Sequence, residues 1–273
     1  MRRYAFDWVD AFTDRAFGGN GCAVVHDGAA LDDATCTDFV KETSLVECTF
    51  TGPSDVADVR VRYFLASGEI PFAGHPTIAT VAALRARGIA TGDHLTLETG
   101  AGVVAITIEG DLIEMTQRAP EFGVMPGRAV VAGAIGLPVD AILGEPQVVS
   151  TGLPFCVTVL RDHAALRAAR LDPEAMPTFK AACGVAMDAV LEPFLVTLEG
   201  ATGTGDTFSR LLMLPPLPAE DPFTGSATGA TAAYLWHHGL MEHAGYTAEQ
   251  GHWMGRPGQA RVTRIGTPTP SRA

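Results

Sequence analysis

The chain has 273 residues and a formal net charge of −12, and 47% of its residues are hydrophobic. The acidic balance argues against a nucleic-acid partner, because phosphate backbones are bound by basic surfaces. No apolar run approaches the ~20 residues that a membrane helix needs, and the start "MRRYAFDWVDAF" lacks the long apolar core of a signal peptide. We therefore expect a cytoplasmic protein with a substantial core and no membrane partner.

Short β-rich runs bounded by Gly, Asp or Ser predict strands along both halves of the chain. They lie at 4–12, 21–27, 47–52, 59–66, 94–102, 103–111, 146–162, 189–200 and 207–215. Helical patterns lie between them, among others at 33–44, 163–171 and 177–188. Runs of strands with a few helices favour an α+β fold.

The segment 116–128, "TQRAPEFGVMPGR", is rich in Pro and Gly and is typical of a linker. It divides the chain into an N-terminal lobe at 1–118 and a C-terminal lobe at 119–265, followed by a tail at 266–273. In an alternative arrangement, the last strand returns to the N-terminal lobe.

One segment occurs twice, once in each half. Residues 69–88, "EIPFAGHPTIATVAALRARG", align without a gap to residues 220–239, "EDPFTGSATGATAAYLWHHG", and ten of the twenty positions are identical. The shared Pro-Phe-x-Gly-x-x-Thr core and the shared closing glycine favour a duplicated domain over chance matches in an Ala-rich chain. The simplest arrangement is two similar lobes related by a pseudo-twofold axis.

Each copy is predicted to be a loop that enters a helix. Pro76 suits the first helical position, Ser226 suits an N-cap, and Gly88 and Gly239 suit the helix ends. A helix N-terminus offers free N–H groups and a partial positive charge, so two such ends can hold a small carboxylate or phosphate. Capped helices are common, however, and a purely structural role remains open for each.

The two copies differ at positions where chemistry can reside. His75 in the first copy aligns with Ser226, and Ile70 aligns with Asp221. A histidine, an aspartate and a serine near two helix N-termini suit proton transfer beside an anion. The alternative is that His75 is a structural cap and Asp221 a turn former.

The sequence offers no sign of a metal or disulfide framework. The five cysteines, an odd number, contain no CxxC pair, and the eight histidines form no HxxxH or HExxH pair. We expect no metal.

Six motifs together resemble the PhzF-like isomerase family, named for phenazine biosynthesis. In chain order they are "VDAFTDRAFGGNGCAVV" (9–25), "SLVECTF" (44–50), "GHPT" (74–77), "VSTGLPF" (149–155), "EDPFTGSA" (220–227) and "EQGHWMGRPG" (249–258). The resemblance runs nearly end to end. It implies a diaminopimelate epimerase-like fold of two lobes, each a small β-barrel around a central helix, with the active site in the cleft between them.

The resemblance also implies site residues. The glutamate that shuttles the proton in the family matches Glu47, and the family's cleft histidine and aspartate match His75 and Asp221. The residues that hold the substrate carboxylate match Gly74, Gly225 and Ser226. No cofactor or metal is implied, and a homodimer is expected.

Racemases of the same fold use two cysteines, one from each repeat. The matching positions are Ala73 and Thr224, so two-cysteine racemisation is not expected. Cys48 follows Glu47 in a predicted strand and should point to the opposite face, into the core. Cys22 is given no role.

The sequence departs from the usual family pattern near the expected site. Ser44-Leu45-Val46-Glu47 stands where the family commonly has Asn-Leu-Ser-Glu, and Gly19-Asn20-Gly21 where Gly-Asn-Pro is common. The first hypothesis is a cofactor-independent isomerase that moves a proton and a double bond within a small unsaturated carboxylate, such as trans-2,3-dihydro-3-hydroxyanthranilate or another secondary metabolite. The alternatives are an epimerase or racemase that uses a carboxylate, and a non-catalytic ligand-binding protein.

Overall fold

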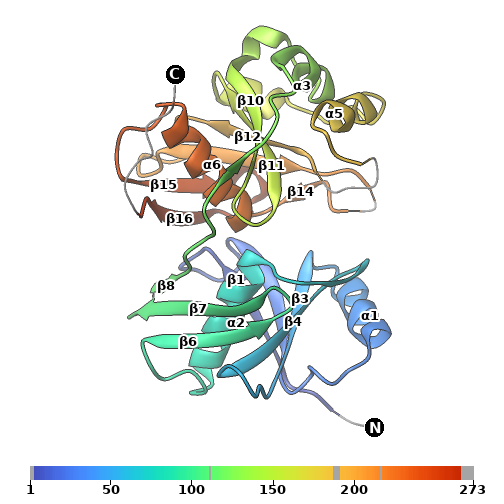
Figure 1. Ribbon diagram of the computed structural model, residues 1–273, viewed down its shortest axis with the longest axis vertical. Coiled ribbons are helices and arrows are strands. Elements are labelled where there is room, and N and C mark those ends of the chain that lie inside the picture. Colours follow the sequence, from blue (N-terminus) through green and yellow to red (C-terminus); the bar gives the residue numbers. More distant parts are fainter. Residues whose placement is uncertain (1–2, 111, 187–190, 216, 266–273) are drawn as a thin grey trace. The chain divides into compact units, whose positions relative to one another are not determined.

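The computed structural model describes residues 3–110, 112–186, 191–215 and 217–265, so the predicted tail at 266–273 lies outside the described residues. The chain divides into two compact units, Met1–Thr116 and Gln117–Ala273. We call them the N-terminal lobe and the C-terminal lobe, and each is described by itself (Figure 1). Among the described residues, no helix is both long enough and apolar enough to cross a membrane.

The N-terminal lobe is built on one mixed sheet of eight strands. These are β1 (Phe6–Ala11), β2 (Asn20–Val25), β3 (Glu47–Gly52), β4 (Val59–Leu65), β5 (Gly68–Ile70), β6 (His94–Thr99), β7 (Gly102–Glu109) and β8 (Leu112–Glu114). Its helices are α1 (Asp33–Thr43) and α2 (Gly74–Ala86).

The C-terminal lobe is built on a second mixed sheet of eight strands. These are β9 (Glu121–Phe122), β10 (Ile142–Ser150), β11 (Pro154–Leu160), β12 (Pro193–Thr197), β13 (Thr207–Leu212), β14 (Glu220–Asp221), β15 (Gly245–Gln250) and β16 (Gly258–Thr263). Its helical elements are α3 (Arg128–Ala134), η1 (Val139–Ala141), α4 (His163–Ala168), α5 (Met176–Ala182), α6 (Gly225–His237) and η2 (His252–Met254).

Seven of the eight strands in each sheet repeat one topology, and the eighth lies at opposite edges: β8 pairs with β7, whereas β9 pairs with β10, the counterpart of β1. The order is β1-β2-β3-β4-β6-β7-β8 with β5 on β4 in the first, and β9-β10-β11-β12-β13-β15-β16 with β14 on β13 in the second. Parallel joins fall at β2–β3 and β4–β6, and again at β11–β12 and β13–β15. The other pairs are antiparallel. The predicted α+β fold and the duplication are both confirmed.

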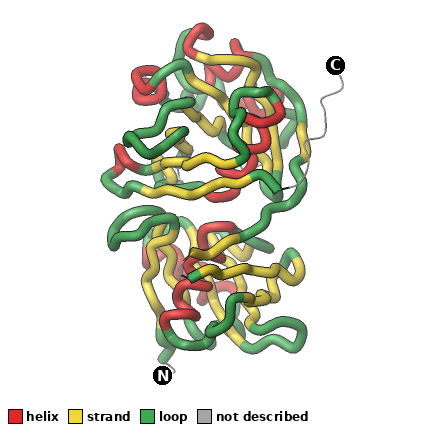
Figure 2. The backbone as a smooth tube through the Cα atoms, turned by 90° about the vertical axis from the view of Figure 1, so that its left-hand side faces the viewer, coloured by secondary structure: helices red, strands yellow, loops and turns green. Residues whose placement is uncertain are grey.

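A central helix packs inside each sheet. In Figure 2 the strands of each lobe lie around helical segments. Helix α2 contributes Val81 and Leu84 to one core cluster and Ala79 and Ala83 to another, so it is buried on more than one side. Helix α6 likewise buries most of its length in the C-terminal core. A helix that is apolar on all sides is typical of such a central position.

The strand predictions agree with the structure, since each predicted run contains a strand. The short strands β5, β8, β9 and β14, the final pair β15 and β16, and helix α3 had no prediction. Strand β16 pairs with β15 in the C-terminal sheet and does not return to the N-terminal lobe. The helix predicted at 177–188 ends at Ala182, and its last two positions lie outside the described residues.

Two of the predicted helix starts are wrong and both predicted ends are confirmed. Ser226 is the second residue of α6 and not its cap, which is Thr224. Pro76 is the third residue of α2, where its missing N–H still costs nothing because first-turn amides have no intrahelical partner. Gly88 and Gly239 follow the helix ends with φ of 70° and 66°, the left-handed conformation that glycine favours there.

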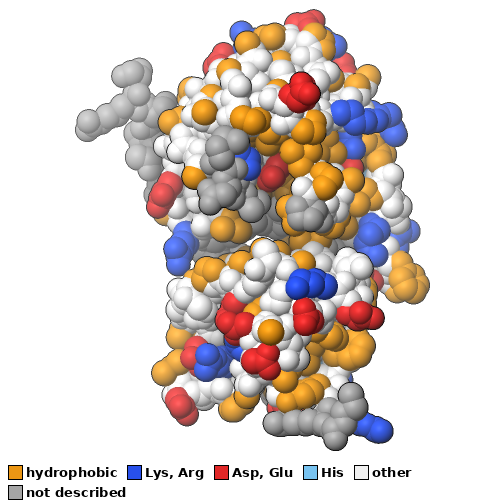
Figure 3. All heavy atoms as spheres, turned by 90° about the vertical axis from the view of Figure 1, so that its right-hand side faces the viewer, with side chains coloured by type: hydrophobic (Ala, Val, Ile, Leu, Met, Phe, Trp, Pro, Cys, Tyr) orange, Lys and Arg blue, Asp and Glu red, His pale blue; other side chains and the backbone are white. Residues whose placement is uncertain are grey.

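Acidic side chains gather on the face of the N-terminal lobe seen in Figure 3, in keeping with the net charge of −12.

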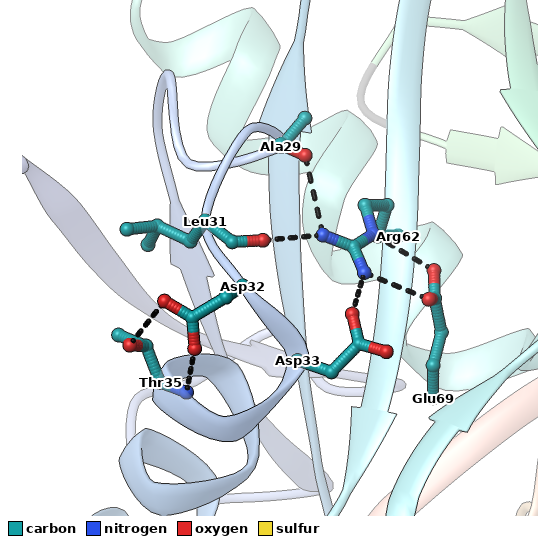
Figure 4. A network of polar contacts seen from close by, with 7 residues as sticks. All are labelled: Ala29, Leu31, Asp32, Asp33, Thr35, Arg62 and Glu69. Carbon is teal, nitrogen blue, oxygen red and sulfur yellow. Dashed lines mark hydrogen bonds and ion pairs between the residues drawn. The ribbon is translucent and has the colours of Figure 1, made fainter.

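A pair of opposite charges occupies equivalent positions in the two lobes. The guanidinium of Arg62 on β4 binds both carboxylate oxygens of Glu69 on β5 at 2.9 and 2.8 Å, and also contacts Asp33 and the carbonyls of Ala29 and Leu31 (Figure 4).

The C-terminal lobe repeats this contact. Arg210 on β13 binds both carboxylate oxygens of Glu220 on β14 at 2.9 and 2.7 Å and donates to the Leu166 carbonyl. We call Arg62 and Arg210 the clamp arginines. Each clamp arginine ties a strand hairpin to a segment that leads into or lies in a neighbouring helix, and each hairpin runs directly into the central helix of its lobe.

Replacing Arg210 by Met should lower the free energy of unfolding by about 3 kcal/mol, because it leaves the Glu220 carboxylate, whose side chain is 13% exposed, without its bidentate partner. Arg161→Met is the matched control, because the Arg161 side chain is 50% exposed and its ion pairs are screened by water. Urea denaturation of both variants checks this. Equal, small losses for the two would contradict the role of the clamp.

Candidate active site

Strand β3 presents alternate residues to different helices. The Thr49 hydroxyl lies 2.8 Å from the Thr80 hydroxyl on α2, so Glu47, two residues earlier, is on the side of the strand that faces α2. Cys48 and Phe50 point the other way into a core cluster that includes α1 residues. The expectation that Cys48 is a core residue is confirmed.

Glu47 meets His75 at the start of the central helix. Its Oε2 lies 3.0 Å from His75 Nδ1, and the two side chains are 14% and 6% exposed. The Asn20 amide nitrogen, from the first residue of β2, lies 3.4 Å from the same ring nitrogen. We call Asn20, Glu47, Gly74 and His75 the N-terminal polar cluster. A carboxylate and an imidazole in hydrogen-bond contact can share and relay a proton.

The first turn of α2 is fixed by hydroxyl groups. Thr77 donates to the Ala73 carbonyl at 2.7 Å and lies 2.8 Å from the Tyr63 hydroxyl. Burial raises the pKa of Tyr63, so its hydroxyl stays protonated. Ala73, the N-cap, has no side chain that can cap the helix. Gly74 has no side chain that could cover the amide groups of the first turn. The amide groups of this turn are therefore suited to an anion.

A second group of polar residues lies at the start of α6. The Thr224 hydroxyl donates to Asp221 Oδ2 at 2.5 Å, and its backbone N–H donates to Gln250 Oε1 at 3.0 Å. Because the Thr224 hydroxyl donates to Asp221, it makes no capping hydrogen bond to the helix. Gly225 and Ser226 are the first two helical residues. We call Asp221, Thr224, Gly225, Ser226 and Gln250 the C-terminal polar cluster.

The linker contributes one more contact to this cluster. Gln117 donates to the Gly225 carbonyl at 2.9 Å and accepts from Thr151 at 2.5 Å. Its amide lies where any side chain at Gly229 would stand, because a Cβ there would be 1.8 Å from Gln117 Oε1. The glycine in α6 thus allows the linker to pack on the first turn.

The structure groups the six predicted site residues by lobe: Glu47, Gly74 and His75 in the first, and Asp221, Gly225 and Ser226 in the second. Their roles stay predictions. Sequence reasoning missed Asn20 and Gln250, although both lie in motifs that it quoted, GGNG and EQGHW. No short-range pattern predicts that either side chain reaches a helix N-terminus.

A further carboxylate was also missed. Phe50 of β3 and Leu195 of β12 pair with the two clamp arginines, so they are equivalent positions. Three residues before them stand Glu47 and Glu192, which makes Glu192 the counterpart of Glu47. Glu192 is 9% exposed. Burial raises the pKa of its carboxyl, an effect that Lys180 only partly offsets.

The five cysteines are all buried and unpaired with one another by disulfides. Burial raises the pKa of Cys22 and of Cys48, which keeps both thiols protonated and poorly nucleophilic. Among the described residues, no group of three or more His, Cys, Asp or Glu side chains could hold a metal ion. The acid/base candidates in the two polar clusters are carboxylates and an imidazole.

The family model for phenazine biosynthesis-like proteins matches residues 9–269. The chain belongs to this family. It is 32% identical over 269 residues to the uncharacterized isomerase YddE of Escherichia coli O157:H7, covering 93% of this chain and 88% of the relative. It is 31% identical to the trans-2,3-dihydro-3-hydroxyanthranilate isomerase of Pseudomonas fluorescens, covering 91% and 86%. The chain is thus a PhzF-like isomerase.

Solved structures of the family are similar in fold. A PhzF-family phenazine biosynthesis protein of Bacillus anthracis matches with a TM-score of 0.84 and 26% identity, covering 96% of this chain and 90% of the other. A predicted epimerase of Pseudomonas aeruginosa matches with a TM-score of 0.79 and 32% identity, covering 96% and 92%. A hydroxyproline epimerase of Agrobacterium vitis, with a TM-score of 0.59 and 14% identity over 98% and 86% of the chains, shares the fold alone.

The raised pKa of Glu192 predicts a pH-dependent cost in stability. The folded state binds this proton more tightly than the unfolded state, so stability falls as pH rises from the usual carboxyl value through the folded value. Glu192→Gln should therefore raise the midpoint of thermal unfolding at neutral pH and have less effect in mild acid. Glu174→Gln, at an exposed position of the same lobe, is the control. A gain that is equal at both pH values would contradict this explanation.

Proposed function

We propose that the protein moves a proton and a double bond within a small unsaturated carboxylate-bearing metabolite, with Glu47 as the acid/base. The observation that carries this proposal is the contact of the Glu47 carboxylate with His75 Nδ1 at 3.0 Å, beside the first turn of a central helix. Both side chains are largely buried, which strengthens their electrostatic interaction with a bound substrate.

In the proposed reaction, the Glu47 carboxylate takes a proton from one carbon of the substrate. The electron pair of that C–H bond forms a new double bond, and the old double bond opens toward a second carbon. Glu47, now a carboxylic acid, delivers its proton to that second carbon. His75 orients Glu47 and stabilises its charge, and Asp221 acts on the same substrate as an orienting or charge-stabilising group.

The substrate carboxylate is proposed to bind to Gly74, Gly225 and Ser226. The N-caps Ala73 and Thr224 make no side-chain capping bond, so the first-turn amides keep their donor capacity for an anion. Ser226 is partly exposed and adds a hydroxyl donor.

The substrate proposed first is trans-2,3-dihydro-3-hydroxyanthranilate, on which the Pseudomonas fluorescens relative acts by name. One departure from the usual family pattern packs against the segment that leads into Glu47: a Cβ added at Gly21 would stand 3.3 Å from the Leu45 side chain and 3.3 Å from Trp8 Nε1. A residue change beside the proposed substrate pocket favours a related unsaturated amino acid as the second substrate to test.

Epimerisation is the second candidate, supported by the 32% identity to a predicted epimerase. It would use the same carboxylate to remove and return a proton at one stereocentre. The thiol-dependent form of this reaction has no support, because Ala73 and Thr224 stand where such racemases carry cysteines. The homodimer expected from the family resemblance also stays a prediction.

Glu47→Gln should lower kcat by roughly 10²–10⁴-fold, because the amide cannot accept and return a proton. It should leave substrate binding nearly intact, since Gln keeps the shape of Glu. The measurement is the rate of loss of trans-2,3-dihydro-3-hydroxyanthranilate by chromatography. Glu114→Gln, at an exposed position of β8, is the matched control and should keep the wild-type rate.

Two results would count against the proposal. Equal rates for the Glu47→Gln variant and the wild type would remove Glu47 from the chemistry. Tight binding of the substrate by the wild type without any turnover, over a panel of unsaturated amino acids, would point to a ligand-binding role.

A further inference from the structure

The duplication provides an internal comparison between the two lobes. Strands β6 and β15 are each followed by a glycine that packs on the proline of the repeated segment. A Cβ on Gly100 would lie 3.1 Å from the Pro71 carbonyl oxygen, and one on Gly251 would lie 2.5 Å from the Pro222 carbonyl oxygen. The frame around the start of each central helix is therefore the same in both lobes.

Charged and hydroxyl contacts are repeated as well. Glu98 on β6 accepts a hydrogen bond from the Ser54 hydroxyl at 2.6 Å, and Glu249 on β15 accepts one from the Thr202 hydroxyl at 2.5 Å. Together with the contacts of the two clamp arginines, they form a framework that is common to both lobes.

The two lobes differ at three equivalent positions. In the C-terminal lobe the three residues are all polar and are hydrogen-bonded to one another, and in the N-terminal lobe they are not. The β5 and β14 registers pair Ile70 with Tyr63 and Asp221 with Leu211, one residue after each clamp arginine. The second pair consists of the N-cap residues of α2 and α6, and the third pair consists of the last residues of β6 and β15. The pairs are Ile70 and Asp221, Ala73 and Thr224, and Thr99 and Gln250.

Gln250 is fully buried and makes three hydrogen bonds with Asp221 and Thr224. Its Oε1 accepts from the Thr224 N–H at 3.0 Å and lies 3.4 Å from the Ser209 hydroxyl, whose single proton is shared with the Glu249 carbonyl at 3.2 Å. Its Nε2 donates to the Asp221 carbonyl at 2.8 Å and to Thr224 Oγ1 at 3.2 Å. Because a backbone N–H can only donate, it must face Oε1, and this sets the orientation of the whole amide.

The orientation of the amide determines that of the Thr224 hydroxyl. Nε2 can only donate, so Thr224 Oγ1 is an acceptor toward Gln250 and has its proton left for Asp221 Oδ2, which it meets at 2.5 Å. Thr99, the counterpart of Gln250, instead closes a local turn by donating to the Gly102 carbonyl at 2.7 Å. The N-terminal lobe thus adopts the same fold without any such relay.

We propose that Gln250 is a positioning residue for the isomerase reaction, which acts through the Thr224 hydroxyl to hold the Asp221 carboxylate in its reactive orientation. This inference rests on the proposed function, in which Asp221 acts on the substrate. It assigns a role to the EQGHW motif, whose glutamate and glycine serve the common framework and whose glutamine serves the reaction.

The test compares Gln250→Met with Gln147→Met. Gln147 is also a buried glutamine of the C-terminal lobe, and it bonds to the Gly123 carbonyl and to His238. Both variants lose buried hydrogen bonds, so a general loss of stability affects them alike. Gln250→Met should lower kcat by roughly 10- to 100-fold with little change in KM, and Gln147→Met should keep kcat within about twofold of the wild type, because its contacts do not reach Asp221.

A double-mutant cycle with Thr224→Val shows whether Gln250 acts through the hydroxyl. Thr224→Val keeps the side-chain shape and should also lower kcat. If Gln250 acts through Thr224, the double variant should be no slower than the slower single variant. Multiplying losses, or an unchanged kcat in Gln250→Met, would overturn the proposal.

Crystal structures of the wild type and of Gln250→Met decide the case without turnover. The inference predicts that the Asp221 carboxylate changes its rotamer or loses its contact with Thr224 in the variant. An unchanged carboxylate would overturn it. Inactivity of the wild type toward every substrate tested would count against the proposed function alone, since the structural comparison would still show whether Gln250 holds Asp221.

Discussion

The structure depends on enclosing one apolar helix within each sheet. Helices α2 and α6 are 13 residues each and are buried along most of their length. Such burial supplies much of the hydrophobic free energy of each lobe, but it carries the helix N-terminus and its unpaired N–H groups into the same position in both lobes. The hairpins held by Arg62 and Arg210 fix the chain just before these two ends.

Because the two lobes share one framework, residues at a few positions can be set by function and not by stability. The first helix start has His75 and Glu47, the second has Asp221, Thr224 and Gln250, and the scaffold contacts around them are shared. Because the shared framework carries one polar set in the first lobe and a different one in the second, neither set is required by the architecture that the lobes have in common. Buried polar groups that a fold does not require are costly unless they are fully hydrogen-bonded, and their presence points to a demand made by the chemistry.

The fold could be predicted well from the sequence because its signals are local or repeated. Alternating strands, the glycine ends of the central helices and the doubled segment are all visible without coordinates. Strands β15 and β16 carry weaker patterns, and β14, a two-residue strand, exists only because β13 pairs with it. The helix starts were misplaced because the N-caps are Ala73 and Thr224. Neither makes a side-chain capping bond, so the pattern of residue types does not mark where the helices begin.

The site could be predicted only in part. Its named carboxylates and His75 come from motifs, but the contacts of Asn20 and Gln250 link segments 55 and 29 residues away in sequence, and such contacts depend on tertiary packing. Glu192 becomes visible as the counterpart of Glu47 only once the sheet registers are known.

Proton NMR of wild-type protein with trans-2,3-dihydro-3-hydroxyanthranilate in deuterated water tests the central claim most directly. We expect the substrate signals to be replaced by those of an isomer in which a double bond and one C–H position have moved. A substrate that keeps its double bonds while one stereocentre exchanges its hydrogen for deuterium would contradict the account and establish epimerisation.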